Sequence, residues 1–150
     1  MTADLTEADY GALADFRFSL RQFLAFSEKK AAECGLTPQQ HQALLAIRAA
    51  PKGMATVGYV AERLILKPHS ATGLVDRLEA LGLVSRQPSM NDRRQALLKL
   101  SKHALAILAA LSVTHREEIL RVRPLLVQLL KSLEHDEGPV RLSTVAETAA

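Results

Sequence analysis

Two groups of polar and basic side chains lie in the stretch LILKPHSATGLVDRLEALGLVSRQPSMNDRRQALLKLS, residues 64–101. The first group follows Pro68 along a helical pattern, in which apolar residues recur at steps of three and four. Serine and threonine hydroxyls can hydrogen-bond to either type of base, and histidine can contact guanine or phosphate. The second group is the run SMNDRR, and arginine is the side chain that a narrow minor groove attracts. The two groups therefore predict contacts with DNA in two different grooves.

The predicted DNA contacts include both groups and the residues around them. Arg86, on a predicted strand, is expected to meet phosphate, which positions a protein on DNA without specifying sequence. The full set is Lys67, Pro68, His69, Ser70, Thr72, Gly73, Arg77, Arg86, Asn91, Asp92, Arg93 and Arg94.

Several of these residues have a second interpretation. Ser70 and Thr72 could serve only to cap the first helical turn. Gly73 costs about 1 kcal/mol relative to alanine inside a helix, and either close approach of DNA or neutral drift accounts for it. Asp92 would repel phosphate if it pointed outward, so we expect it to pair with Arg77 and to hold the charged run against the helix.

The distribution of charge supports a nucleic-acid surface. Residues 62–103 carry eight Lys or Arg against four Asp or Glu, whereas the rest of the chain carries 11 against 12. The excess positive charge thus lies in the middle third of the chain, as expected of a DNA-binding face. A basic but merely solvated face is the alternative.

The elements that must position these residues are mostly helices. Apolar periodicity, Gly and Pro predict helices from residue 7 to 33, from Thr37 onward, over 57–64 and over 68–81. Leu81 is expected to complete the buried stripe of the last of these. Two strands, 83–87 and 95–100, are joined by a charged loop. This pattern predicts a mainly α fold with a small β-hairpin wing, a winged helix-turn-helix.

The outer parts of the chain are predicted to be helical arms. All four phenylalanines lie in the first helix, which is more apolar surface than one helix of a small protein can bury internally, so a second subunit is expected. After Ser101 the chain returns to helix, with a kink or a new helix start at Pro124. We therefore divide the chain into an N-terminal dimerisation helix (1–35), a winged helix-turn-helix DNA-binding domain (36–101) and C-terminal dimerisation helices (102–150).

The runs LTPQQHQALLAI, VAERL and SATGLVDRLEALGLVSRQPSMNDRRQALLKLS resemble the MarR (multiple antibiotic resistance regulator) family of bacterial transcription factors. The resemblance covers roughly residues 36–101. It implies a homodimer in which the N- and C-terminal helices interlock and each subunit presents one winged helix. Asp92 and Arg94 match the family's wing motif of Asp, any residue, Arg, in which the arginine reaches the minor groove.

These observations predict a cytoplasmic, sequence-specific DNA-binding transcriptional regulator that binds an inverted-repeat operator as a homodimer. The resemblance implies a repressor released by a small aromatic or anionic ligand, and Phe16, Arg17, Arg21 and Phe23 offer an apolar wall beside cations for it. A plain dimer core with surface arginines is the alternative for these four residues. The alternative functions are an oxidant-sensing regulator acting through Cys34 and a winged-helix module that binds protein and not DNA.

Catalysis, cofactors and metals have no support in the sequence. It contains no Gly-rich phosphate loop, no Cys/His metal spacing and no nucleophile motif. His115 and Glu118 have a spacing of three that some metal sites use, but without a second such pair we expect a solvated helix face. The N-terminus is acidic and does not resemble a signal peptide, no stretch is apolar enough to span a membrane, and the lone Cys34 excludes an internal disulfide.

Overall fold

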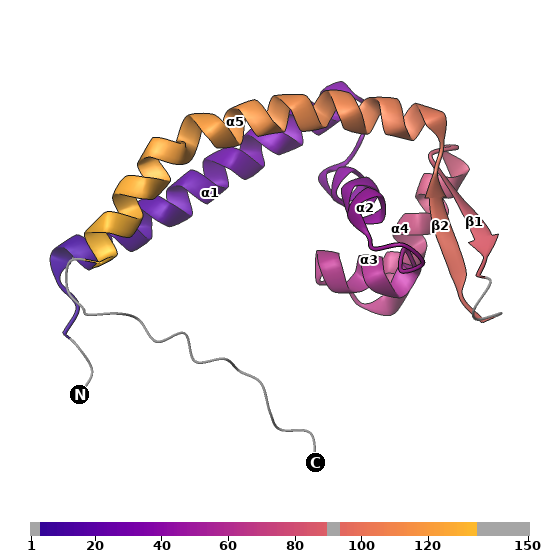
Figure 1. Cartoon of the computed structure of the whole chain (residues 1–150), viewed down its shortest axis with the longest axis horizontal. Helices are drawn as coiled ribbons and strands as arrows, with labels where there is room; N and C mark the ends of the chain where they lie inside the picture. The colour runs from indigo at the N-terminus through magenta and orange to yellow at the C-terminus, as the bar shows by residue number, and fades with distance from the viewer. Residues whose placement is uncertain (1–3, 90–93, 135–150) are drawn as a thin grey trace, which may run out of the picture.

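The computed structural model describes residues 4–89 and 94–134. Two long helices lie antiparallel as an arm, and the remaining elements form a lobe where the first of them ends and the second begins (Figure 1). The mainly α fold with a two-stranded hairpin confirms the predicted class. The elements are α1 (Glu7–Glu33), α2 (Pro38–Ala49), α3 (Val57–Leu64), α4 (Pro68–Ala80), β1 (Val84–Pro88), β2 (Ala96–Leu100) and α5 (Lys102–Glu134).

Local side-chain chemistry sets where the helices begin and end. Thr6, Thr37 and Thr56 each precede a helix, and each hydroxyl accepts from a backbone N–H three residues later. At the end of α1, Gly35 adopts a left-handed φ of 75° and the Leu36 N–H donates to the carbonyl of the last turn. The predicted bounds of α1 and α3 are confirmed because these signals are local.

The lobe is built around the apolar stripe of α4. Leu74, Val75 and Leu78 are almost fully buried with Leu44 of α2 and Val60 of α3. This confirms the predicted stripe over most of its length and fixes the rotation of α4.

The prediction that Leu81 completes the stripe is wrong, since Leu81 is 56% exposed. α4 ends at Ala80, and Gly82 then takes a left-handed φ of 71°. The Leu83 N–H donates to the carbonyl of Leu78, so that Leu83 turns inward in place of Leu81.

The hairpin packs one of its faces on the lobe. β1 and β2 are antiparallel, with Val84 opposite Leu100. Val84, Leu98 and Leu100 are buried, while on the other face Ser85, Gln87 and Lys99 are exposed and Leu97 is half-buried. The Leu98 N–H also donates to the carbonyl of Ala55, which ties β2 to the segment before α3.

α5 is a single helix that continues through Pro124. Of the two possibilities predicted there, a new helix start is wrong. Figure 1 shows α5 bowed along its length, as expected where proline removes one backbone hydrogen bond and packing against α1 holds the helix together. Further along the sequence, the run HDEG at residues 135–138 predicts a break in the chain, and these residues lie outside the described ones.

The turn between α3 and α4 contains a strained residue. Ile65 adopts a left-handed φ of 54°, which is unfavourable for a β-branched side chain, and it is 93% exposed. The Leu66 N–H donates to the carbonyl of Ala61, so the turn requires this backbone conformation.

We expect Ile65→Gly or Ile65→Asn to increase the free energy of unfolding by about 1 kcal/mol, because both residues tolerate the left-handed region and no packing is lost. Urea denaturation followed by circular dichroism measures this. Ile65→Val is the matched control, since it stays β-branched and should give no gain. A destabilised glycine variant would contradict the account.

Candidate nucleic-acid interface

The burial of its apolar stripe leaves the opposite face of α4 in solvent. α3, the turn at Ile65 and α4 form the helix-turn-helix, in which the second helix is the one that enters the major groove. The exposed predicted contacts on α4 and just before it are Lys67, Pro68, His69, Ser70, Thr72 and Arg77. The structure thus brings these predicted residues together on one surface.

The first turn of α4 is uncapped. Lys67 has the extended backbone of an N-cap, but its side chain makes no capping hydrogen bond, and Pro68 occupies the first helical position. The backbone N–H groups that follow are therefore available to an anion such as phosphate. The Thr72 hydroxyl donates to the carbonyl of Pro68 at 3.0 Å, which leaves its oxygen and methyl group for other partners.

Gly73 and Arg77 lie one above the other on this face. A methyl group at Gly73 would meet the Arg77 guanidinium at 3.6 Å, an ordinary contact, so nothing in the described chain requires glycine there. Arg77 forms no ion pair with any described residue. Its predicted partner Asp92 lies outside the described residues, as do Asn91 and Arg93. Arg94 is described and exposed at the base of the hairpin loop.

Arg86 has a different environment from the one we expected. One terminal nitrogen lies 2.7 Å from Asp76 and the other 2.9 Å from Glu79, both on α4. The hydrogen bond to Asp76 raises the pKa of Arg86 above its usual value, and Glu79 adds to this effect. In the described chain the Arg86 guanidinium therefore fastens the hairpin to α4, and its contact with phosphate stays a prediction.

Strand periodicity explains the position of Arg86. It lies on the same face of β1 as the buried Val84, opposite Leu98, and is half-buried against α4. The alternation of the strand could have revealed this, but the two carboxylates on α4 are distant in sequence and their rotation depends on packing.

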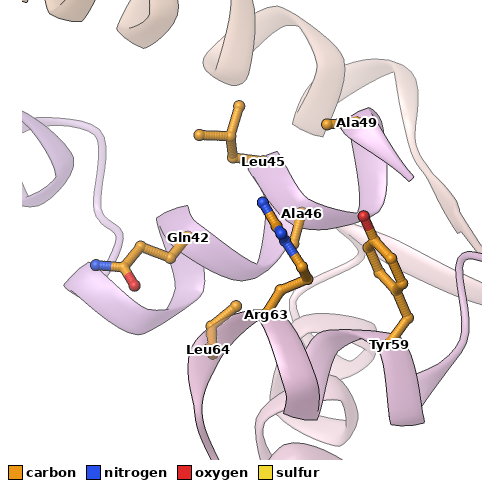
Figure 2. Close-up of a pocket in the computed structure, with 7 residues that line it drawn as sticks. All are labelled: Gln42, Leu45, Ala46, Ala49, Tyr59, Arg63 and Leu64. Atoms are coloured by element: carbon orange, nitrogen blue, oxygen red, sulfur yellow. The ribbon is translucent and has the colours of Figure 1, made fainter. Parts of the chain in front are cut away.

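The four residues predicted to hold a ligand lie on α1. Phe16 is 43% exposed, Arg17 and Arg21 are exposed, and Phe23 is half-buried against the ring of His115. None of the four lines the cavity of about 400 Å³ that opens between α2 and α3. Figure 2 shows side chains of both helices around this space, with Arg63 and Tyr59 reaching from α3 toward α2. Sequence reasoning missed this cavity, because it forms only when the two helices cross.

The prediction of a solvated face around His115 is wrong. Its side chain is buried, and its ring nitrogens lie 2.6 Å from the Leu111 carbonyl and 2.7 Å from the Ser27 hydroxyl. α5 packs against α1 here, so the face that carries His115 is interior. Among the residues that the structure describes, no group of three His, Cys, Asp or Glu could hold a metal ion. No helix within 4–89 or 94–134 combines the length and apolarity required to cross a membrane.

Comparison with known proteins identifies the family. A family model described as MarR family matches residues 35–95. The HTH-type transcriptional repressor MdtR of Bacillus subtilis is 31% identical over 115 residues, which cover 69% of this chain and 73% of that protein. The chain belongs to the MarR family. It is a transcriptional regulator of that family.

Solved structures of MarR regulators share the fold. AbsC of Streptomyces coelicolor has a TM-score of 0.68 at 23% identity, covering 89% of this chain and 94% of AbsC. The Staphylococcus aureus MepR–DNA complex has a TM-score of 0.63 at 17% identity, covering 87% and 98%. At these identities the comparison establishes the fold alone: the winged helix of this MarR chain and the arm formed by α1 and α5.

For this MarR regulator, we expect Arg86→Ala to lower the free energy of unfolding by about 1 kcal/mol, because it leaves Asp76 and Glu79 without their cation. Arg77→Ala, one residue from Asp76 and without an ion pair in the described chain, is the matched control and should stay within about 0.5 kcal/mol of wild type. Urea denaturation at low salt measures both. Equal stabilities for the two variants would contradict the fastening role of Arg86.

Proposed function

We propose that the chain is a sequence-specific DNA-binding repressor that binds an inverted-repeat operator as a homodimer. The observation that carries this proposal is the uncovered polar face of α4 with the hairpin fastened beside it. The MepR neighbour was solved on DNA, and MdtR is named a repressor, which supports the same role here. A protein-interaction module would need an apolar face on α4, whereas most of the exposed residues of this helix are polar or charged.

The residues of α4 divide by chemistry. His69, Ser70 and Thr72 lie in the first turn, the part of a recognition helix that contacts base edges. Lys67 and the uncapped backbone N–H groups suit phosphate. Arg77, one turn further along, adds a cation that no described carboxylate neutralises.

Arg86 contributes to DNA binding indirectly. Asp76 and Glu79 on α4 would repel the phosphate backbone if their charges stood alone. Arg86 binds both carboxylates and offsets this repulsion where the helix lies next to DNA. The same contacts hold β1 against α4, so that the loop carrying Arg93 and Arg94 starts from a fixed base. We propose that these two arginines, with Asn91 and Asp92, form the part of the wing that approaches the minor groove.

The arm provides the surface for a second subunit. Its exposed apolar side chains are too many and too large for a protein that stays a monomer. They include Leu13, Phe16, Phe18, Leu20 and Leu24 of α1 and Val113, Ile119, Leu120, Val127, Leu130 and Leu133 of α5. Figure 1 shows the arm extending well beyond the lobe, and no other described element packs along the part that extends. We propose that residues 1–35 and 102–150 make the dimer and residues 36–101 bind DNA.

We further propose that a small aromatic or anionic ligand releases the repressor from DNA. In BpsR of Bordetella bronchiseptica, whose solved structure resembles this chain, 6-hydroxynicotinic acid regulates DNA binding. Here, the cavity between α2 and α3 joins apolar walls to the Arg63 guanidinium, which has no ion pair in the described chain, and the Tyr59 phenol. Because α3 supports α4, a ligand in this cavity would shift the recognition helix.

The residues on α1 are the second candidate for this ligand, and oxidant sensing is the alternative mode of regulation. Phe16, Arg17, Arg21 and Phe23 would form a site only if the partner subunit covers α1. Cys34 is a free and exposed thiol just after the end of α1, so it is accessible to oxidants. The ligand site on α1 and the oxidant-sensing role of Cys34 both stay predictions.

The first test of DNA binding uses a duplex selected by the wild-type chain from a random-sequence library. Alanine at His69, Ser70 or Thr72 should cost about 1–3 kcal/mol on the selected duplex and much less on a scrambled one, because base contacts specify and phosphate contacts do not. Thr72→Ser and Thr72→Val separate the hydroxyl from the methyl contribution. Equal losses on both duplexes would show that these residues contact only the backbone.

The second test concerns the subunits. Light scattering of the free protein at micromolar concentration should give twice the chain mass. Leu130→Glu, at a position 60% exposed on the arm, should lower the measured mass toward that of the monomer. Leu81→Glu, at a position 56% exposed on the lobe, should leave the measured mass unchanged. A wild-type monomer at this concentration would overturn the dimer proposal.

A further inference from the structure

A pair of histidines occupies the junction where the arm meets the lobe. His115 of α5 lies 4.9 Å, ring to ring, from His41 of α2. Phe23 and Phe26 of α1 meet the His115 ring edge-on, at 5.9 Å and 5.7 Å. Both histidines are buried, His41 to 5% exposure and His115 to 9%. Three helices therefore meet at these two rings.

Both ring nitrogens of His115 have hydrogen-bond partners. A carbonyl oxygen can only accept, so Nδ1 donates its hydrogen to Leu111. Nε2 forms a hydrogen bond with the Ser27 hydroxyl of α1, which can act as donor or acceptor. These two contacts hold the ring in place and tie α1 to α5.

His41 has no such arrangement. Its Nδ1 is buried and has no hydrogen-bond partner among the described residues. An unpaired polar atom in this position is costly, and a charged ring without a counter-ion is more so. The junction therefore tolerates His41 only as a neutral ring.

No carboxylate offsets a charge at the junction. Neither histidine forms an ion pair with a described residue. On α1, Lys30 places its ammonium 5.8 Å from the Phe26 ring and pairs with Glu33. On α5, Glu118 pairs with Arg121, and on α2 the only other ionisable side chain is Arg48.

We propose that His41 and His115 form a proton-sensitive junction: with His41 neutral the packed rings hold the arm on the lobe, and acidification charges His41, separates the rings and weakens DNA binding. The inference rests on the proposed function for its effect on DNA. In the proposed dimer the arms set the distance between the two recognition helices. A loosened junction then allows each lobe to move relative to the arm, and the helices lose their register with successive major grooves.

The direction of the pH effect follows from burial. Burial lowers the pKa of His41 below its ordinary value of 6.5, and His115 lowers it further. The open junction therefore binds a proton more readily than the packed one. The packed pair makes its full contribution to the stability of the junction above about pH 6.5. This contribution is lost as the pH falls through the lowered pKa of His41.

The test must remove a competing histidine first. His69 on α4 is exposed at the proposed DNA surface, so its contribution must be separated from that of the junction. All measurements therefore use the full chain carrying His69→Gln, with a duplex that this variant itself selects from a random-sequence library as the probe. We expect its Kd to rise about threefold or more between about pH 7.5 and pH 5.5, since one pKa unit of difference corresponds to a factor of ten.

Matched variants locate the effect. In the same background, His41→Gln should bind equally well at both pH values, whereas His103→Gln, at an exposed position early in α5, should keep the loss. A Kd independent of pH in the His69→Gln protein overturns the proposal. So does an undiminished pH dependence in the His41→Gln protein.

A measurement without DNA keeps the proposal testable if His41→Gln does not fold. Hydrogen exchange of the His69→Gln protein, corrected for the intrinsic effect of pH, should show reduced protection around Ser27, His41 and His115 at the lower pH. Unchanged protection there contradicts the junction. If the wild-type chain selects no duplex at the higher pH, that contradicts the proposed function instead, and the exchange result decides the junction separately.

Discussion

The buried stripe of α4 is the constraint on which the rest of the lobe depends. Ala71, Leu74, Val75 and Leu78 can be buried in only one rotation of the helix, and that rotation determines which side chains face outward. The polar surface proposed to contact DNA is thus a consequence of core packing. The hairpin takes its place from the same helix, through the inward turn at Leu83.

Features that depend on neighbours in sequence could be predicted, and features that depend on contacts between elements could not. The helix at residues 7–33 follows from a threonine cap, apolar periodicity and a glycine end, all of them local. The residues exposed on α4 follow from its period of 3.6. The ion pairs of Arg86 and the burial of His115 were not predicted, because their partners, Asp76 and Ser27, belong to other elements.

The errors at Leu81 and Pro124 share a physical cause. At both positions a rule based on neighbouring residues describes the backbone correctly, but it does not describe the packing around that backbone. Gly82 ends α4 as expected, yet the capping geometry turns Leu83 inward and leaves Leu81 in solvent. Pro124 does remove a backbone hydrogen bond, yet packing along α1 keeps α5 continuous. Tertiary contacts decide such positions, and a single sequence does not display them.

Two polar contacts reinforce places where the apolar core already joins parts of the chain. Arg86 joins the hairpin to α4, and at the junction of arm and lobe the His41 ring packs against His115, which Ser27 holds within the arm. Apolar packing is non-directional and would permit small sliding at both places, whereas hydrogen bonds fix orientation. The proposed dimer must hold two recognition helices at one spacing, which requires such fixed angles. Because a few charged or titratable groups add this orientation to the apolar packing, each angle can be altered while the core of the lobe stays packed.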